Sequence, residues 1–185
     1  MKRYILTGAP GAGKTAILRQ LELDGFGVVE EAATDWIAVR QAAGIAEPWM
    51  EPDFVDAVAR LQRLRLQRAS GDVQFHDRSV ICTVALAKYL GLAVSDFVAG
   101  QVERVRREGI FEPRVLFVRN LGFVEPTAAR RISFEETLRF ERMHEEIYRE
   151  YGFETVFIEP GRLAERVAAV KRACRAQGLS PGRES

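Results

Sequence analysis

The stretch that decides the fold lies near the amino terminus and reads Gly8-Ala9-Pro10-Gly11-Ala12-Gly13-Lys14-Thr15. It fits the pattern G-x-x-x-x-G-K-[ST] at every fixed position. A short apolar run at residues 4–7 precedes it, and helical sequence follows at residues 14–23. A chance match in a glycine-rich turn would need neither flanking element, so a simple turn is the weaker interpretation.

The chemistry of phosphate binding explains this spacing. Glycines and small residues let successive backbone N–H groups turn inward around a β-phosphate, and the following helix presents its positive amino-terminal end. We expect Lys14 to reach the β- and γ-phosphates and the Thr15 hydroxyl to coordinate Mg²⁺. The stretch is therefore interpreted as a Walker A motif, or P-loop, which binds ATP or alternatively GTP through residues 8–15 and the adjoining Ala16.

Strand-like and helix-like segments alternate along the whole chain, which is typical of an α/β fold. The predicted strands are residues 4–7, 28–30, 72–77, 115–118 and 155–158. The predicted helices are residues 14–23, 32–43, 53–69, 80–90, 95–108, 134–151 and 163–176. This order predicts a doubly wound, five-stranded parallel sheet with helices on both faces.

The length of 185 residues suits one domain. We expect this domain to span residues 1–178 and to be followed by a flexible tail at residues 179–185. Residues 119–133 show no clear periodicity, and a loop of that length in a compact domain is often a functional lid.

The composition limits the classes of partner. A formal net charge of +1 gives no general attraction to nucleic acid or to an anionic membrane. Arginines at positions 60, 63, 65 and 68 offer a nucleic-acid alternative, but their spacing spreads them around a helix and favours a solvated face. No apolar stretch is long enough to span a membrane, so we expect a cytoplasmic chain. The oligomeric state stays open, with a homodimer as one alternative.

An acid ends the third predicted strand. Asp77 stands at the carboxyl edge of the sheet, beside the crevice in which ligands of such sheets bind. A carboxylate at this position binds Mg²⁺ directly or through water in P-loop proteins. The alternative is an aspartate that caps the helix beginning near Ser79.

Two further acids, Glu30 and Glu31, end the second predicted strand at the same edge. A carboxylate there can accept the proton of a substrate hydroxyl as this hydroxyl attacks the γ-phosphate. The alternative is that both acids only interact favourably with the helix dipole.

A pair of arginines, Arg130 and Arg131, lies in the aperiodic segment. A guanidinium group matches phosphate oxygens, so arginines on a lid can stabilise the charge on a phosphoryl group in transfer. Solvated side chains are the alternative. The two histidines, His76 and His144, receive no role from the sequence.

The chain resembles the small bacterial P-loop family grouped with the kinase domain of nicotinamide riboside kinases and often labelled an AAA-type ATPase domain. The resemblance runs through MKRYILTGAPGAGKT, VVEEAATDW, FHDRSV, ARRISFEE and YGFETVFIEPGRLAERV, in this order. It implies a phosphotransferase with ATP and Mg²⁺. Residues 44–69 hold no distinctive nucleoside-binding motif, and Trp36, Trp49 and Phe54 could stack on a flat substrate or belong to the core.

A looser similarity joins the chain to deoxynucleoside kinases. Glu31, five residues before Trp36, is similar to their acid-then-tryptophan pattern, whose acid serves as the base. Asp77-Arg78-Ser79 resembles a motif whose arginine contacts phosphate and the phosphorylated end of the substrate. This similarity implies catalytic roles for Glu31, Asp77 and Arg78 and for the lid arginines Arg130 and Arg131, beside the role that the Walker A motif predicts for Lys14.

Two functions are open at this stage. The first is a kinase that transfers the γ-phosphate of ATP-Mg to a small, hydroxyl-bearing, nucleoside-like metabolite. The alternative is a stand-alone NTPase or a nucleotide-dependent switch that acts on a protein partner. A GTPase switch would normally carry an Asn-Lys-x-Asp motif, which this sequence lacks.

Overall fold

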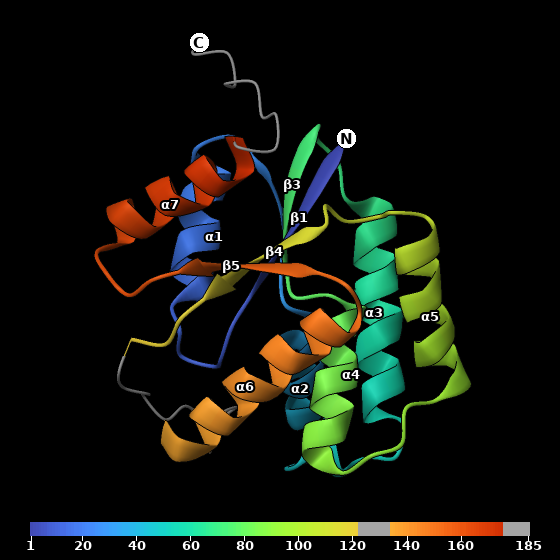
Figure 1. Ribbon diagram of the computed structural model, residues 1–185. Helices are drawn as coiled ribbons and strands as arrows, with labels where there is room; N and C mark the ends of the chain where they lie inside the picture. Colours follow the sequence, from blue (N-terminus) through green and yellow to red (C-terminus); the bar gives the residue numbers. More distant parts are fainter. Residues whose placement is uncertain (122–133, 176–185) are drawn as a thin grey trace.

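The computed structural model describes residues 1–121 and 134–175. Five parallel strands form one sheet in the order β2-β3-β1-β4-β5, which confirms the predicted α/β class (Figure 1). The strands are β1 (Lys2–Thr7), β2 (Gly27–Val29), β3 (Val73–Asp77), β4 (Arg114–Val118) and β5 (Glu154–Ile158). The central strand, β1, leads directly into the P-loop, so both halves of the sheet support this loop.

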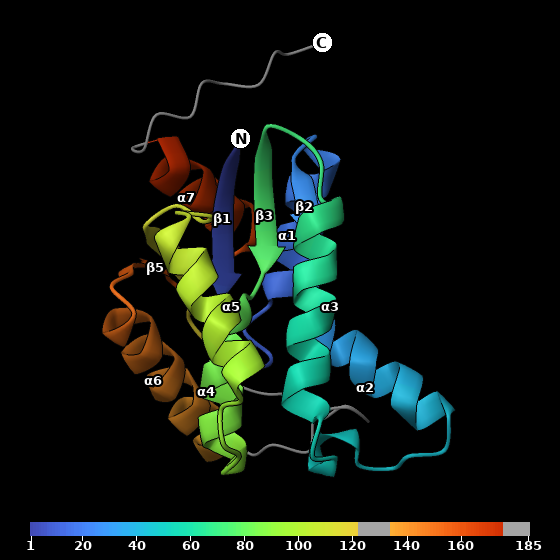
Figure 2. The ribbon, with the colours of Figure 1, turned by 90° about the vertical axis from the view of Figure 1, so that its right-hand side faces the viewer.

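Helices cover both faces of the sheet, as the doubly wound prediction requires (Figures 1 and 2). The helices are α1 (Lys14–Leu23), α2 (Ala32–Ala42), α3 (Phe54–Arg68), α4 (Val80–Leu90), α5 (Asp96–Arg107), α6 (Phe134–Glu150) and α7 (Leu163–Arg175). A short 3₁₀ turn, η1 (Pro48–Met50), interrupts the connection from α2 to α3. Within the described residues, no helix is both long and apolar enough to cross a membrane.

The alternation of side chains along β1 divides the core into two parts. Tyr4 and Leu6 pack with α1 and α7 on one face, whereas Ile5 packs with α3, α4, α5 and α6 on the other. All three side chains are buried, which is expected for a parallel strand covered on both faces. The sheet therefore separates a smaller core beneath the P-loop helix from a larger four-helix core.

Most predicted boundaries agree with the structure to within one or two residues. The largest differences are at β1, which begins at Lys2, and in the segment at residues 44–52, which contains η1. The alternative cap for α4 is wrong, because Ser79 holds that position and its Oγ accepts a hydrogen bond from the Ile81 N–H at 3.2 Å. The predicted lid, apart from residues 119–121, and the predicted tail lie outside the described residues.

The first glycine of the P-loop lies directly against β4. Gly8 has a φ of 135°, and a Cβ atom built there would lie 2.2 Å from the Val118 carbonyl oxygen. No side chain fits at this distance, and the atoms that it would meet belong to the backbone of Val118, which cannot swing aside. Gly8 thus lets the chain leave β1 over the end of β4.

We predict that Gly8→Ala lowers the free energy of unfolding by roughly 1–3 kcal/mol, because the new methyl group must displace backbone. Gly100→Ala is the matched control, since Gly100 lies inside α5 with nothing within 4 Å of its Cβ position. That variant should raise the free energy of unfolding by about 0.5–1 kcal/mol. Urea denaturation of both variants measures these changes, and equal stability of Gly8→Ala and the wild type would contradict the close approach.

Candidate functional site

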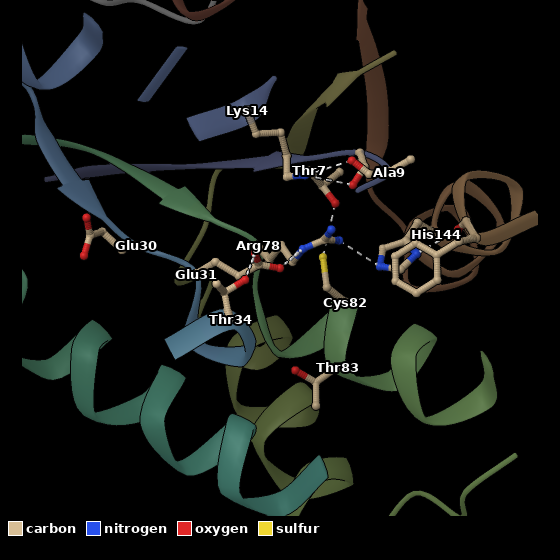
Figure 3. Close-up of polar contacts among 12 residues, drawn as sticks. Thr7, Ala9, Lys14, Glu30, Glu31, Thr34, Arg78, Cys82, Thr83 and His144 are labelled. Carbon is tan, nitrogen blue, oxygen red and sulfur yellow. Dashed lines mark hydrogen bonds and ion pairs between the residues drawn. The ribbon is translucent and has the colours of Figure 1, made fainter. Parts of the chain in front are cut away.

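The lysine of the P-loop is hydrogen-bonded to the backbone of the same loop. The Lys14 ammonium is buried and donates hydrogen bonds to the carbonyl oxygens of Gly8, at 3.2 Å, and Ala9, at 3.0 Å (Figure 3). Lys14 begins α1, and Gly13 precedes it with a φ of 76°. The lysine is thus placed at the start of the helix, where the positive end of the helix dipole also acts on an anion.

Asp77 lies at the same edge of the sheet from which the P-loop starts. Asp77 is buried at the carboxyl end of β3 and pairs in register with Leu6 of the central strand. The exposed Thr15 follows Lys14 in the first turn of α1. One carboxylate and one hydroxyl are oxygen donors of the kind that Mg²⁺ prefers, so these residues fit a Mg²⁺ ion that bound phosphates also hold. Within the described residues, no group of three or more His, Cys, Asp or Glu side chains forms a metal site without such phosphates.

Arg78 lies at the centre of the site. Its guanidinium is buried; its Nε donates to Glu31 Oε1 at 2.5 Å and its NH1 bonds to His144 Nε2 at 3.1 Å (Figure 3). The backbone N–H of Arg78 donates to the Leu6 carbonyl at 3.0 Å. We call the three side chains the Glu31–Arg78–His144 cluster.

The backbone of Arg78 has a positive φ of 69°, which among the described residues no other non-glycine residue shares. A single residue in the left-handed region costs on the order of 1 kcal/mol. The hydrogen bond to Leu6 and the contacts of the guanidinium offset this cost. The tight turn directs the side chain of Arg78 into the site immediately after β3 ends.

The structure brings Glu31, and not Glu30, into the site. Glu31 occupies the position before α2, and its Oε2 accepts a hydrogen bond from Thr34 Oγ1 at 2.7 Å. Burial alone would raise the pKa of Glu31, but the positive charges of Arg78 and Lys14 outweigh it and hold this pKa well below its usual range. Glu30 is exposed and pairs with Arg19.

His144 is a site residue that sequence reasoning missed. Its Nδ1 lies 2.9 Å from the carbonyl oxygen of Phe140, so Nδ1 carries the proton and Nε2 accepts from Arg78. Burial, followed by the charge of Arg78, holds the pKa of His144 well below its usual value. The apolar neighbours Phe140, Ile147 and Tyr148 share its helix face, and this spacing was the signal that His144 points inward.

A cavity of about 410 Å³ opens between the Glu31–Arg78–His144 cluster and the helices α2, α3, α4 and α6. Its aromatic lining comprises Trp49, Phe54, Tyr89 and Phe140. Pro10 of the P-loop also lines it, so the cavity reaches the phosphate-binding loop. Trp49 and Phe54 both line the cavity and contribute to the core, so both alternatives stay open for them, whereas Trp36 packs against the core outside the cavity lining.

Two polar side chains of the cavity also escaped the sequence analysis. Gln62 of α3 accepts from Thr83 Oγ1 at 2.8 Å and donates to the Ser79 carbonyl at 3.2 Å. These bonds fix the amide inside a largely apolar lining. Neither residue belongs to a motif, so only the fold brings them to the cavity.

The outcome differs for the remaining predicted residues. Arg130 and Arg131 are outside the described residues, and their role stays a prediction. Some of the α3 arginines considered for nucleic-acid binding contact other side chains. Arg65 pairs with Asp35, and the Arg60 guanidinium carbon lies 4.3 Å from the centre of the Phe97 ring.

The chain is similar in sequence to one protein family and in fold to several solved structures. Residues 3–166 match the family model described as AAA domain. No curated protein matches the sequence. Among solved structures, a NadR protein in complex with NR has a TM-score of 0.69 at 22% identity, with 100% of this chain and 53% of that chain covered. The chain thus spans about half the length of that protein.

Two shorter proteins are similar over nearly their whole length. Deoxyadenosine kinase from M. mycoides with bound dCTP has a TM-score of 0.65 at 12% identity and covers 95% of this chain and 100% of its own. Shikimate kinase from Acinetobacter baumannii, in complex with shikimate, has a TM-score of 0.52 at 18% identity, over 97% and 96% of the two chains. At these identities the likeness shows a shared fold.

The neutral state of His144 predicts a pH dependence of stability. The unfolded chain binds a proton on this histidine as the pH falls through 6.5, its ordinary pKa, whereas the folded chain does not. Stability should therefore fall below pH 6.5, and the contribution of His144 should approach roughly 1.4 kcal/mol per pH unit.

Urea denaturation between pH 7.5 and pH 5 measures this slope. His144→Gln keeps a donor and an acceptor but cannot take up the proton, so its slope should be shallower by about that amount. Identical slopes for the variant and the wild type would show that His144 is not held neutral.

Proposed function

Because the chain belongs to the AAA domain family, we propose from its site geometry that it is a kinase. It transfers the γ-phosphate of ATP-Mg to a hydroxyl group of a small, nucleoside-like metabolite. One observation carries this proposal: a cavity of about 410 Å³ is lined both by Pro10 of the P-loop and by Glu31, whose carboxylate is ionised. Its size falls within the usual range of small-molecule sites.

Nucleotide binding in this proposal uses the P-loop, residues 8–16. The backbone N–H groups surround the phosphates, and Lys14 moves from the carbonyl oxygens of Gly8 and Ala9 to the β- and γ-phosphates. Thr15 and Asp77 would hold a Mg²⁺ ion, which would supply neutralisation of charge on the phosphate oxygens when bound.

Glu31 acts on the acceptor. Its carboxylate accepts a hydrogen bond from the acceptor hydroxyl and so aims this oxygen at the γ-phosphorus. As the new O–P bond forms and the bond to the β-phosphate oxygen breaks, the hydroxyl proton passes to Glu31. The ion pair with Arg78 lowers the basicity of Glu31, which suits a loose transition state in which positioning and charge neutralisation dominate.

The cavity lining supports a flat acceptor. The aromatic side chains of Trp49, Phe54, Tyr89 and Phe140 offer stacking surfaces, and Gln62 offers a fixed amide for a ring heteroatom. The structural neighbours in complex with NR, dCTP and shikimate support a small-molecule ligand. A protein-directed switch or stand-alone NTPase would not need this cavity.

The first test is ATP consumption with Mg²⁺ against a panel of nucleosides, nicotinamide riboside and other small hydroxyl compounds. We expect turnover that depends on one acceptor, and loss of this turnover in Lys14→Ala, whose fold circular dichroism should show intact. Slow turnover that ignores every acceptor would instead favour the NTPase or switch.

The second test uses two adjacent glutamates. Glu31→Gln should lower phosphoryl transfer by roughly 10²–10⁴-fold while ATP affinity stays within about twofold. Glu30→Gln should leave transfer unchanged, because Glu30 is exposed and its carboxylate pairs with Arg19. Removing the charge of Glu31 also leaves Arg78 buried beside a neutral partner, so rates must be compared below the lowered melting temperature. Full transfer in Glu31→Gln would refute its role.

A further inference from the structure

An arginine of the last helix contacts the P-loop. Arg166 lies in the first turn of α7 and is 5% exposed, whereas Arg172 and Arg175 of the same helix are exposed. Its NH2 donates a hydrogen bond to the carbonyl oxygen of Ala12. Its NH1 would lie 2.8 Å from a Cβ atom built on Gly13. Arg166 thus packs directly on the peptide that joins Ala12 to Gly13.

This arginine is buried without a carboxylate partner. Among the described residues Arg166 forms no ion pair, and its buried Nε has no hydrogen-bond partner there. Burial lowers the pKa of this guanidinium. An uncompensated positive charge in a protein interior is costly, so a nearby anion would stabilise this arrangement. The P-loop, one peptide away, is built to hold such an anion.

The geometry of the peptide unit gives Arg166 a second effect. All described peptide bonds are trans, so the C=O of Ala12 and the N–H of Gly13 point in opposite directions. Because Arg166 holds this carbonyl toward α7, the Gly13 N–H is directed away from α7. A hydrogen bond at the carbonyl also polarises the N–H group of the same peptide.

We propose that Arg166 is a positioning residue for the nucleotide phosphates: it fixes the Ala12–Gly13 peptide and places a buried positive charge beside the P-loop. The inference rests on the nucleotide-binding part of the proposed function and is independent of the acceptor. Helix α7, which carries Arg166, covers the same face of the sheet as α1, opposite the helices that line the cavity.

The test is calorimetric titration with a non-hydrolysable ATP analogue and Mg²⁺. Arg166→Met removes the charge and the hydrogen bond but keeps much of the side-chain volume, and it should raise Kd by about tenfold or more. Arg166→Lys keeps the charge and one donor for Ala12, so it should restore Kd to within about threefold of the wild type. Arg172→Met, an exposed change on the same helix, should leave Kd unchanged.

Inorganic tripolyphosphate with Mg²⁺ serves as a second probe. Because Arg166 acts at the phosphates, Arg166→Met should weaken binding of tripolyphosphate by the same factor. A loss confined to the ATP analogue would overturn the inference, since it would place the effect at the nucleoside part. In transfer assays, KM for ATP should rise while kcat changes little.

Two other outcomes would count against the proposed role of Arg166. A Kd of Arg166→Met within twofold of the wild type would overturn its role. Equal losses in Arg166→Met and Arg166→Lys, with lowered melting temperatures in both, would show a purely structural contact. Failure of the wild type to bind either probe would refute nucleotide binding itself, whereas loss of transfer with intact probe binding would concern only the proposed kinase reaction.

Discussion

Arg78, with its buried guanidinium, joins the parts of the molecule that must meet in the proposed phosphoryl transfer. Its backbone N–H bonds to the end of β1, its Nε pairs with Glu31 at the start of α2, and its NH1 bonds to His144 of α6. These contacts connect three segments that are distant in sequence. A buried charge is tolerated only when it is paired and hydrogen-bonded. The contacts of Arg78 with Glu31 and His144 therefore constrain the positions of α2 and α6.

The fold was largely predictable because its signals are local. The Walker A motif between a strand and a helix, and the alternation of apolar runs with helical periodicity, indicated the class and most boundaries. The strand order was not predictable in the same way, since it depends on which β-strands pair across long stretches of chain. The sequence left capping of α4 open as an alternative role of Asp77, because aspartate is a good capping residue, and only the geometry shows that Ser79 holds the position.

The site was predictable where a motif carries it and not where packing creates it. Lys14, Glu31 and Arg78 belong to recognisable patterns, and the structure brings Glu31 and Arg78 together. His144, Gln62 and Arg166 belong to none. Each is a polar residue on a helix whose burial follows from how that helix packs, and a helical pattern alone does not say which polar residue faces a ligand. Arg130 and Arg131 are outside the described residues, and their role as lid arginines stays a prediction.

The two cores on either side of the sheet support different parts of the candidate site. The smaller core, beneath α1 and α7, supports the P-loop, whereas the larger one, with α3, α4, α5 and α6, supports the cavity. Side chains of β1 alternate between them. Substitutions on the helices that form the cavity wall can therefore accumulate without repacking the core beneath α1 and α7. In the proposed kinase, one acceptor can thus be exchanged for another while the phosphate donor remains the same, because the two cores evolve on opposite faces of the sheet.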